Sequence, residues 1–393
     1  MTEAPAFEQI SMTEEHRFPC ESCGSDLRFE PGTDLLSCDH CGNQQQIEHS
    51  AGFRGQAVRE LDFRRAIKEG LSEFDMAEIQ TVTCTNCGAH NEFDADTHAA
   101  ECPFCATPIV TGTGVERQIK PRGLLPFHLS EKEARQQMTD WLGRLWFAPS
   151  GLKAYARKGR KMSGVYVPYW TYDAQTQSDY TGQRGTVYYE TRRVSVVVNG
   201  RRQMRTRQVP KIRWKNVRGR VARFFDDVLV LASQSLPKKY TDGLAPWDLS
   251  SMQPYRPEYL AGFRAEGYTV TLEDGYAEAA EHMNRMIERD VRFDIGGDRQ
   301  QIDHISTDVG TLTFKHVLLP VWVAAYKYQG KTYRFVVNGR TGNVQGERPF
   351  SKWKIIFAIL FGLIVAAIFG YMVAHGQNNG TFPNGNFNLE WLD

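Results

Sequence analysis

Two copies of one cysteine pattern constrain this chain more than any other feature of its sequence. The pattern is a pair of Cys-x-x-Cys units with fourteen residues between them, and it occurs twice, at Cys20, Cys23, Cys38 and Cys41 and at Cys84, Cys87, Cys102 and Cys105. These are all eight cysteines of the 393-residue chain. Four thiolates at this spacing form the ligand set of a structural zinc ion. The sequence therefore predicts two N-terminal four-cysteine zinc ribbons with one zinc ion each.

The two repeats also match between and after their cysteines. A glycine follows the second cysteine, a phenylalanine occupies the same offset, and an isoleucine follows the fourth cysteine, at Gly24, Phe29 and Ile47 and at Gly88, Phe93 and Ile109. Units this small bury little apolar surface, and metal binding supplies about 10–16 kcal/mol of apparent folding free energy in comparable zinc peptides. We expect the metal to hold each ribbon together.

Other uses of the cysteines stay open at this point. Disulfides need an oxidising compartment, and the N-terminal segment has no apolar signal region. A redox dithiol is typically a single Cys-x-x-Cys unit beside a βαβ pattern. Interleaved ligation, with knuckles of both repeats sharing a metal, is a further alternative. We interpret the nearby histidines as surface residues because four cysteines complete each site, and these are His40, His49, His90 and His98.

An uncharged segment near the C-terminus is long enough to cross a bilayer. Ile355 to Ala374 is twenty residues without a charge, which spans about 30 Å as a helix. A buried core helix is the alternative. Basic residues precede the segment and none follows it except His375, so the positive-inside rule predicts a cytoplasmic body and an outside tail at 375–393. The expected protein is a single-pass protein of the inner membrane.

Small residues recur along one face of this segment. Gly362, Ala366 and Gly370 lie four positions apart, the spacing that lets two membrane helices approach closely. The pattern would allow a homodimer through this helix, and the alternative is that it reflects the general abundance of small residues in membrane helices.

The region from 113 to 350 combines helical and strand patterns. A capping box of Ser130 and Glu133 predicts a helix that ends before Pro149, with its apolar residues on one face. Amphipathic periodicity predicts further helices at about 58–74, between the ribbons, and at about 276–291.

The remaining pattern of this region is typical of antiparallel strands. Asn199-Gly200 and Asn338-Gly339 are hairpin turn signals. Segments 165–173 and 317–326 resemble each other, with a proline two residues before a tryptophan, and predict a duplicated β-unit. Prolines within such runs indicate edge strands or strand starts.

One stretch of this region is strongly basic although the net charge of the chain is only +1. Residues 192–223 contain twelve Lys or Arg and no acid. Strand alternation would gather much of this charge on one face, which is able to bind the phosphates of membrane lipid or of nucleic acid. A solvated hairpin face is the alternative. The candidate anion-binding residues are Arg201, Arg202, Arg205, Arg207, Lys211, Arg213 and Lys215.

No catalytic constellation is evident in the sequence. The chain contains no phosphate-binding loop of the Walker type, no zinc-protease motif and no nucleophile elbow. We interpret Asp226-Asp227 and Gly296-Gly297-Asp298 as acidic turns or strand ends. The expectation is that the protein is not an enzyme.

Several segments together carry a resemblance to a known family, namely residues 18–47, the second cysteine repeat, the two proline-containing segments and the terminal helix. The chain resembles a family of bacterial membrane-anchored double zinc-ribbon proteins. These are often labelled primosomal protein N-prime (replication factor Y) or superfamily II helicase. The helicase label implies ATP-driven DNA unwinding, but this chain has no phosphate-binding loop and no acidic helicase motif. Related zinc-ribbon membrane proteins imply an adaptor role beside phage-shock or stomatin-like membrane-stress scaffolds.

The sequence thus predicts an α+β protein with a modular order. The expected parts are a first zinc ribbon at 1–50, a linking helix at 51–80, a second zinc ribbon at 81–112, a sheet-rich α+β domain at 113–350, a transmembrane helix at 355–374 and a tail at 375–393. The expected function is a membrane-anchored adaptor that binds a protein partner through its ribbons. The alternative is a nucleic-acid-binding protein related to replication restart.

Overall fold

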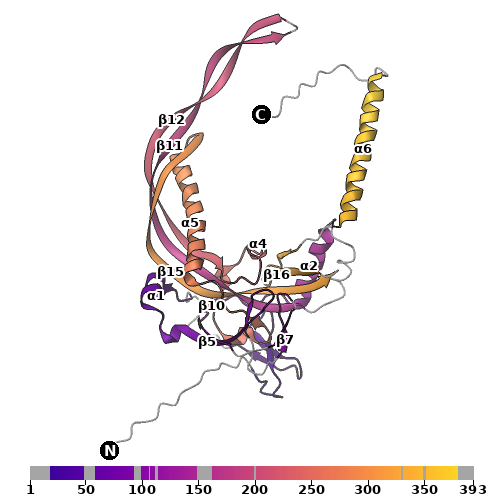
Figure 1. Cartoon of the computed structure of the whole chain (residues 1–393). Helices are drawn as coiled ribbons and strands as arrows, with labels where there is room; N and C mark the ends of the chain where they lie inside the picture. The colour runs from indigo at the N-terminus through magenta and orange to yellow at the C-terminus, as the bar shows by residue number, and fades with distance from the viewer. Residues whose placement is uncertain are drawn as a thin grey trace, which may run out of the picture.

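The computed structural model of the chain confirms the α+β class, with a sheet-rich body between two N-terminal cysteine clusters and a C-terminal helix (Figure 1). The structure describes residues 18–47, 58–92, 99–105, 107–110, 114–147, 162–198, 201–328, 331–347 and 351–378.

Three long antiparallel strands form the frame of the body. They are β11 (Ser163–Val198), β12 (Arg201–Leu231) and β15 (Arg299–Tyr328), and β11 lies between the other two. In the central parts of β11 and β15, β-branched and aromatic residues are buried on both faces of the sheet. Shorter strands complete the sheet, namely β4 (Leu61–Asp62), β10 (Gly123–Leu124), β13 (Gln253–Pro254), β14 (Arg264–Ala265), β16 (Lys331–Asn338) and β17 (Val344–Gly346).

The helix α5 (Leu272–Ile295) covers the concave side of the long strands (Figure 1). It begins earlier and ends later than the predicted range of 276–291. The hydroxyl of Thr271 accepts a hydrogen bond from the Asp274 amide at its start, and Gly296, with φ of 64°, ends it. Its buried stripe includes Met283 and Ile287, which the periodicity predicted.

The capping-box helix is confirmed as α2 (Glu131–Arg144). The Ser130 hydroxyl accepts a hydrogen bond from the Glu133 amide, and the Glu133 carboxylate accepts one from the Ser130 amide. Ala134, Met138 and Leu142 are buried on one face, as their spacing predicted.

The predicted linking helix at 58–74 is wrong in length. The helix α1 (Phe63–Glu69) has only seven residues, because Asp62 caps its start and Gly70, with φ of 78°, ends it. Residues 73–75 form a 3-10 turn, and β5 (Met76–Thr83) follows directly. The connection between the ribbons is therefore short helix, turn and strand.

The two proline-containing segments pair with each other at the centre of the sheet. In the register of β11 with β15, Pro168 lies opposite Leu318, and Tyr166 lies opposite Pro320. The prediction that these prolines mark edge strands is therefore wrong. Each proline lies where one flanking strand ends and the next begins, between the β14 and β12 pairings of β11 and between the β10 and β16 pairings of β15. Because a strand is locally missing there, no ladder hydrogen bond needs the absent amide.

The sequence signal at Asn338-Gly339 begins a turn longer than two residues. The Asn338 amide donates to the Asn343 carbonyl 2.9 Å away, and the Asn338 side chain is buried. Its carbonyl oxygen accepts hydrogen bonds from the amides of Arg340 and Thr341. This turn joins β16 to β17. The other predicted turn, Asn199-Gly200, lies outside the described residues, while its flanking residues Val198 and Arg201 pair with each other.

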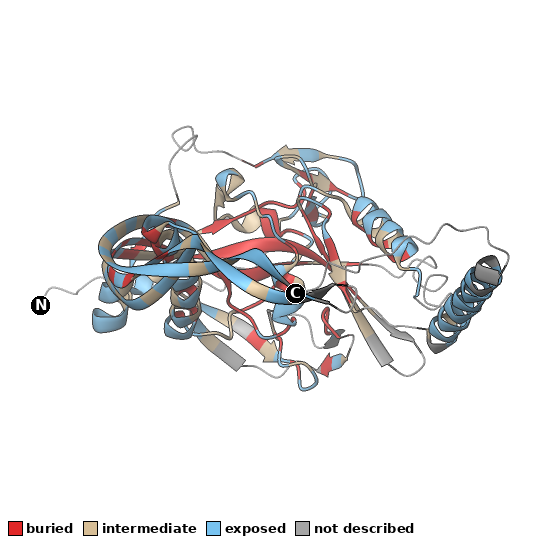
Figure 2. Cartoon of the chain, turned by 90° about the horizontal axis from the view of Figure 1, so that it is seen from above, coloured by how far each residue is buried: buried red, intermediate tan, exposed pale blue. Residues whose placement is uncertain are grey.

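The core lies on both faces of the sheet, at its centre (Figure 2). On β11 and β15, even-numbered residues such as Tyr166 and Trp322 pack in one cluster with the first ribbon and α2. Odd-numbered residues such as Val165 and Leu319 pack in a second cluster with the second ribbon. The two ribbons therefore cover opposite faces of the same sheet.

Candidate metal centres

The first cysteine cluster is formed by a three-stranded ribbon. Its strands are β1 (Leu27–Phe29), β2 (Leu35–Cys38) and β3 (Gln44–Gln46), and the cysteines lie in the knuckles beside them. The sulfur of Cys20 lies 3.6 Å from that of Cys41, and the sulfurs of Cys23 and Cys38 are 3.5 Å apart. Residues from both ends of the ribbon thus meet at one point.

The second cluster repeats this geometry. Its chain runs through β5, β6 (His90–Glu92), β7 (Ala99–Glu101), β8 (Pro108–Val110) and β9 (Gly114–Ile119). The sulfurs of Cys84 and Cys105 are 3.5 Å apart, and those of Cys87 and Cys102 are 3.6 Å apart. All four sulfurs of each cluster lie within 4.8 Å of one another.

These distances fit a metal site. A tetrahedral zinc with Zn–S bonds of about 2.3 Å would separate its sulfurs by about 3.8 Å. Each cluster takes its four ligands from one repeat, so the arrangement is local and the interleaved alternative is wrong. The two clusters are able to hold a metal ion each, as the spacing predicted.

Glycines with positive φ shape the knuckles. Gly24, Gly42 and Gly88 have φ of 74°, 75° and 73°, a conformation that other residues rarely adopt. The Gly24 amide donates to the Cys20 carbonyl at 2.8 Å, and the Gly88 amide makes the same bond to Cys84. These turns aim both sulfurs of a Cys-x-x-Cys unit at the same point.

The sulfur contacts perturb the thiol pKa values within the second cluster. The hydrogen bond between Cys87 and Cys102 is the largest cause of both shifts, and it lowers the pKa of Cys102 while it raises the pKa of Cys87. One sulfur of the pair therefore ionises readily and the other retains the shared proton. A cation that binds both sulfurs would displace that proton.

The two clusters differ in their exposure. In the first, Cys23 and Cys41 are exposed, together with Glu21, Asp39 and His40 beside them. In the second, Cys84, Cys102 and Cys105 are buried, and Phe104 between the last two is fully buried against the sheet. Phe104 is a core residue that the comparison of the two repeats missed, because it lies inside a knuckle and has no apolar counterpart in the first ribbon.

The other residues of the repeats confirm their predicted roles in part. Phe29 is buried, and its ring centroid lies 5.1 Å from that of Tyr259 in the body. Ile47 and Ile109 are also buried. Neither His40 nor His90 belongs to the cysteine clusters. His40 is exposed as predicted, whereas His90 is half-buried, with its Nδ1 atom 3.3 Å from the Glu116 carboxylate. Phe93, His49 and His98 lie outside the described residues.

The helix α6 (Lys352–Asn378) contains the predicted apolar segment. Its residues Trp353–Val373 are long and apolar enough to span a membrane, and none of that window is buried in the protein. Ser351 donates its amide to the Phe147 carbonyl, and Lys354 donates to the Trp146 carbonyl. In Figure 1, α6 and the cysteine ribbons lie on opposite sides of the body.

The small residues of α6 lie on an open surface. Among the described residues, no heavy atom outside the helix lies within 4 Å of a β-carbon built at Gly362 or at Gly370. Ala366 between them is exposed as well. The three residues are thus available for a second helix, and the homodimer remains a prediction.

The basic residues lie on the free end of the hairpin of β11 and β12. Beyond the pairing of Gly185 with Arg299, no described strand other than its own partner pairs with either arm. Arg202, Arg205, Arg207, Arg213 and Lys215 are exposed. Lys211 forms an ion pair with Glu190 at 2.5 Å, and the side chain of Arg201 lies outside the described residues. The structure brings the predicted anion-binding residues onto one projecting ribbon.

The sequence did not predict an ion cluster in which Lys315 and Asp173 are buried, Asp227 is half-buried and Glu60 is exposed. The ammonium of Lys315 lies 2.7 Å from Asp227, 3.3 Å from Asp173 and 3.2 Å from Glu60. Burial raises the pKa of Asp173 to about 6, although the Asp227 amide donates to its carboxylate. The interpretation of Asp227 as a turn or strand-end residue is wrong, because it lies within β12 at a register shift, with φ of 50°. Asp298 does lie in a turn, after α5.

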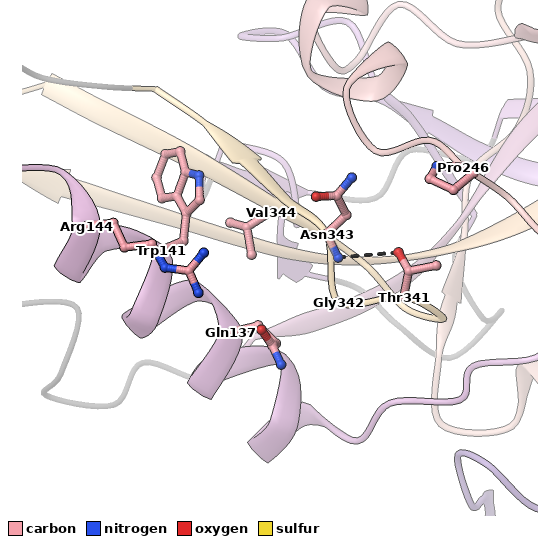
Figure 3. A pocket seen from close by; sticks show the side chains of 8 residues that line it. All are labelled: Gln137, Trp141, Arg144, Pro246, Thr341, Gly342, Asn343 and Val344. Carbon is pink, nitrogen blue, oxygen red and sulfur yellow. Dashed lines mark hydrogen bonds between the residues drawn. The ribbon is translucent and has the colours of Figure 1, made fainter.

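An open cleft of about 310 Å³ lies between α2 and the turn that joins β16 to β17 (Figure 3). Its lining residues are Gln137, Trp141, Arg144, Pro246, Thr341, Gly342, Asn343 and Val344. Arg144 is the only ionisable side chain among them. The lining offers no acid–base pair and no activated nucleophile.

The chain is similar over most of its length to a curated bacterial protein. It is 26% identical over 342 residues to the uncharacterized protein YdjG of Bacillus subtilis (strain 168), which covers 86% of this chain and 91% of YdjG. No model of a protein family matches the chain. No solved structure matches it.

Proposed function

We propose that this chain is a membrane-anchored zinc-ribbon protein that acts as a non-enzymatic adaptor for a cytosolic or membrane-stress partner. The clusters would hold zinc, because four thiolates suit that ion and leave no open position for a substrate. The metal would stabilise the ribbons, and the cysteines would serve as structural ligands.

The observation that carries this proposal is the placement of the first ribbon relative to α6. The exposed knuckles of that ribbon lie on the side of the body opposite the apolar helix (Figure 1). If α6 crosses the membrane, this arrangement turns Glu21, Asp39 and His40 toward the cytosol. A rigid, polar, exposed knuckle pair is suited to bind a protein partner.

The structure changes which ribbon we assign to partner binding. The second ribbon packs its last knuckle against the sheet, and Cys102 and Cys105 are buried there. We therefore assign partner binding to the first ribbon and a structural role to the second.

The test is recovery of a partner from cross-linked cells. The full chain would be purified in mild detergent, and bound proteins identified by mass spectrometry. We expect the parent protein to retain a partner protein. A double variant with Glu21→Lys and His40→Glu should fail to retain that partner, although the metal content of the variant is unchanged. Arg289→Glu, at an exposed position on α5, is the matched control and should retain the partner. Equal recovery with all three proteins, or recovery with none, would contradict the adaptor.

Nucleic-acid binding is a second candidate function. The observation behind it is the basic free end of the hairpin of β11 and β12. Residues 191–215 contain no acid, and most of their basic side chains are exposed. This function predicts an affinity that falls steeply with salt and that weakens when Arg205 and Arg207 are neutralised. An affinity that does not respond to salt would exclude it.

A further inference from the structure

The free end of the β11–β12 hairpin has two chemically different faces. We define the free ribbon as residues 186–198 and 201–213, which pair only with each other among the described strands. At about 3.3 Å per residue, each arm extends about 40 Å beyond the rest of the sheet. Side chains of paired residues point to the same face, so the register assigns every position to one face or the other.

One face is basic and continues the side of the sheet that α5 covers. Closer to the body, Arg184 on this side donates to the Ile295 carbonyl at the end of α5. Further out, the register places Glu190 and five described basic residues on the same side, namely Arg192, Arg205, Arg207, Lys211 and Arg213. Glu190 forms ion pairs with Lys211 at 2.5 Å and with Arg192 at 3.1 Å, so the net positive charge of this face comes from Arg205, Arg207 and Arg213. Arg213 lies over the Tyr188 ring, 5.1 Å from its centroid.

The other face is apolar next to the sheet. The pairs Val187–Ile212 and Tyr189–Pro210 follow one another on it, directly beyond the pair Gly185–Trp214 at the border of the sheet. Their large side chains are exposed, with 64% of Tyr189, 42% of Trp214 and 41% of Ile212 accessible to solvent. Towards the tip this face carries Met204, which is 66% exposed, and the long side chains of Arg193 and Arg202.

We infer that the free ribbon binds the surface of an anionic lipid leaflet. Tyr and Trp are favoured at the boundary between headgroups and acyl chains, and each basic residue near an anionic leaflet contributes about 1 kcal/mol. An element with one apolar and one basic face sinks its apolar face by about 5–10 Å, which leaves the basic side chains at the depth of the phosphates. Glu190 is the one acid of the free ribbon, and no acid lies between 191 and 215, which fits that environment.

The position of α6 favours lipid over nucleic acid as the occupant. The free ribbon and α6 extend from the body toward the same side (Figure 1). The inference therefore rests on the proposed anchoring by α6. A two-stranded ribbon with open edges cannot enter hydrocarbon, because its unpaired backbone groups would lose their water. The ribbon must lean over and lie along the leaflet, beside the point where α6 crosses it.

Adjacent tyrosines on opposite faces supply a sharp test. Tyr189 lies on the apolar face and Tyr188 on the basic face. A photoreactive p-benzoylphenylalanine would replace one of them in the full chain, reconstituted in vesicles of phosphatidylcholine with phosphatidylglycerol. We expect acyl-chain adducts at position 189 to exceed those at position 188 several-fold. Arg205→Gln and Arg207→Gln should each lower the yield at 189 by about fivefold.

A third probe position separates failure of the ribbon from failure of the anchor. Phe361 lies within α6 and is exposed, so p-benzoylphenylalanine there should react with lipid if α6 crosses the membrane. Adducts at 361 without adducts at 189 would overturn the inference and leave the anchoring intact. Equal yields at 188 and 189, or cross-links from 189 to a second copy of the chain or to DNA added to the vesicles, would also overturn it. No adduct at 361 would remove the anchoring and the ribbon inference together.

Discussion

The ammonium of Lys315 on β15 lies 2.7 Å from the Asp227 carboxylate on β12, although β11 runs between these two strands. The contact forms at a register shift in the pairing of β11 with β12, where Asp227 has φ of 50°. Asp173 of β11 lies 3.3 Å from the same ammonium, so one lysine joins all three long strands. Opposite charges raise the pKa of Lys315 against the effect of burial, and the lysine remains charged.

Replacing Lys315 by methionine should destabilise the protein strongly. The change would leave Asp173 and Asp227 close together without a cation, and breaking a buried ion pair in this way costs about 3–5 kcal/mol. Denaturant unfolding of the detergent-solubilised full chain measures this cost. Lys239→Met, at an exposed site, is the control and should change stability by less than about 0.5 kcal/mol. A loss below about 1 kcal/mol for Lys315→Met would mean that water reaches the cluster.

The buried imidazole of His316 should make stability depend on pH. Burial lowers the pKa of His316 to about 4, and its Nδ1–H donates to the Ile119 carbonyl at 2.7 Å. Between about pH 4 and 6.5 the unfolded chain binds a proton here that the folded protein does not. The contribution of His316 to the free energy of unfolding is therefore fully present above about pH 6.5 and is lost as the pH falls toward about 4.

The histidine contribution can be isolated with His316→Asn, which keeps a donor for the Ile119 carbonyl. Asp173 acts in the opposite sense, because its raised pKa of about 6 favours folding at low pH, but both proteins contain it. From pH 7 to pH 5 the parent should lose about 2 kcal/mol relative to the variant. Parallel stability curves for the two proteins over this range would contradict a buried neutral histidine.

The two clusters should release zinc at different rates. Cys23 and Cys41 of the first cluster are exposed, whereas Cys84, Cys102 and Cys105 of the second are buried. A chelating dye should therefore remove about one equivalent of zinc quickly and a second slowly, once the ribbon opens.

Variants of each site assign the two phases of zinc release. Cys20→Ser with Cys23→Ser should abolish the fast phase and leave the slow one. Cys84→Ser with Cys87→Ser should do the reverse and destabilise the body more, because its ribbon covers the sheet core. A single rate for both ions would show that exposure of the sulfurs does not control release.

The orientation of α6 gives a further test of the anchor. Lys352 and Lys354 precede the apolar segment, and no lysine or arginine follows it, so the tail should lie outside the cytosol. A reporter enzyme that is active only outside the cytosol should be active when fused after Asp393. Fused after Gly346, ahead of α6, it should be inactive. The opposite pattern would place the ribbons outside and exclude a cytosolic partner.

Local chemistry explains what the sequence predicted correctly. The cysteine spacing places four sulfurs together within one repeat, and the capping box of Ser130 and Glu133 fixes the start of α2 without help from distant residues. The apolar length of α6 is likewise a property of one continuous segment.

The incorrect predictions concern contacts between distant segments. Glu60, Asp173, Asp227 and Lys315 are each unremarkable in their local sequence, and only the strand order brings them together. Pro168 is a signal for an edge strand. In the structure it lies inside the sheet, in the gap on β11 between the residues that pair with β14 and those that pair with β12, where its missing amide is not needed. Both outcomes depend on tertiary pairing, which no single stretch of sequence records.

The attachment of the two ribbons to opposite faces of one sheet has a consequence for biosynthesis. Both ribbons precede β11 and β15 in the chain, so they leave the ribosome before the strands that cover their apolar sides. Phe29 and Phe104 therefore remain exposed to solvent until those strands have been synthesised. If the clusters hold zinc as proposed, cells short of zinc should accumulate nascent chains whose apolar knuckle residues are exposed, and the supply of the ion during translation would limit the yield of mature protein.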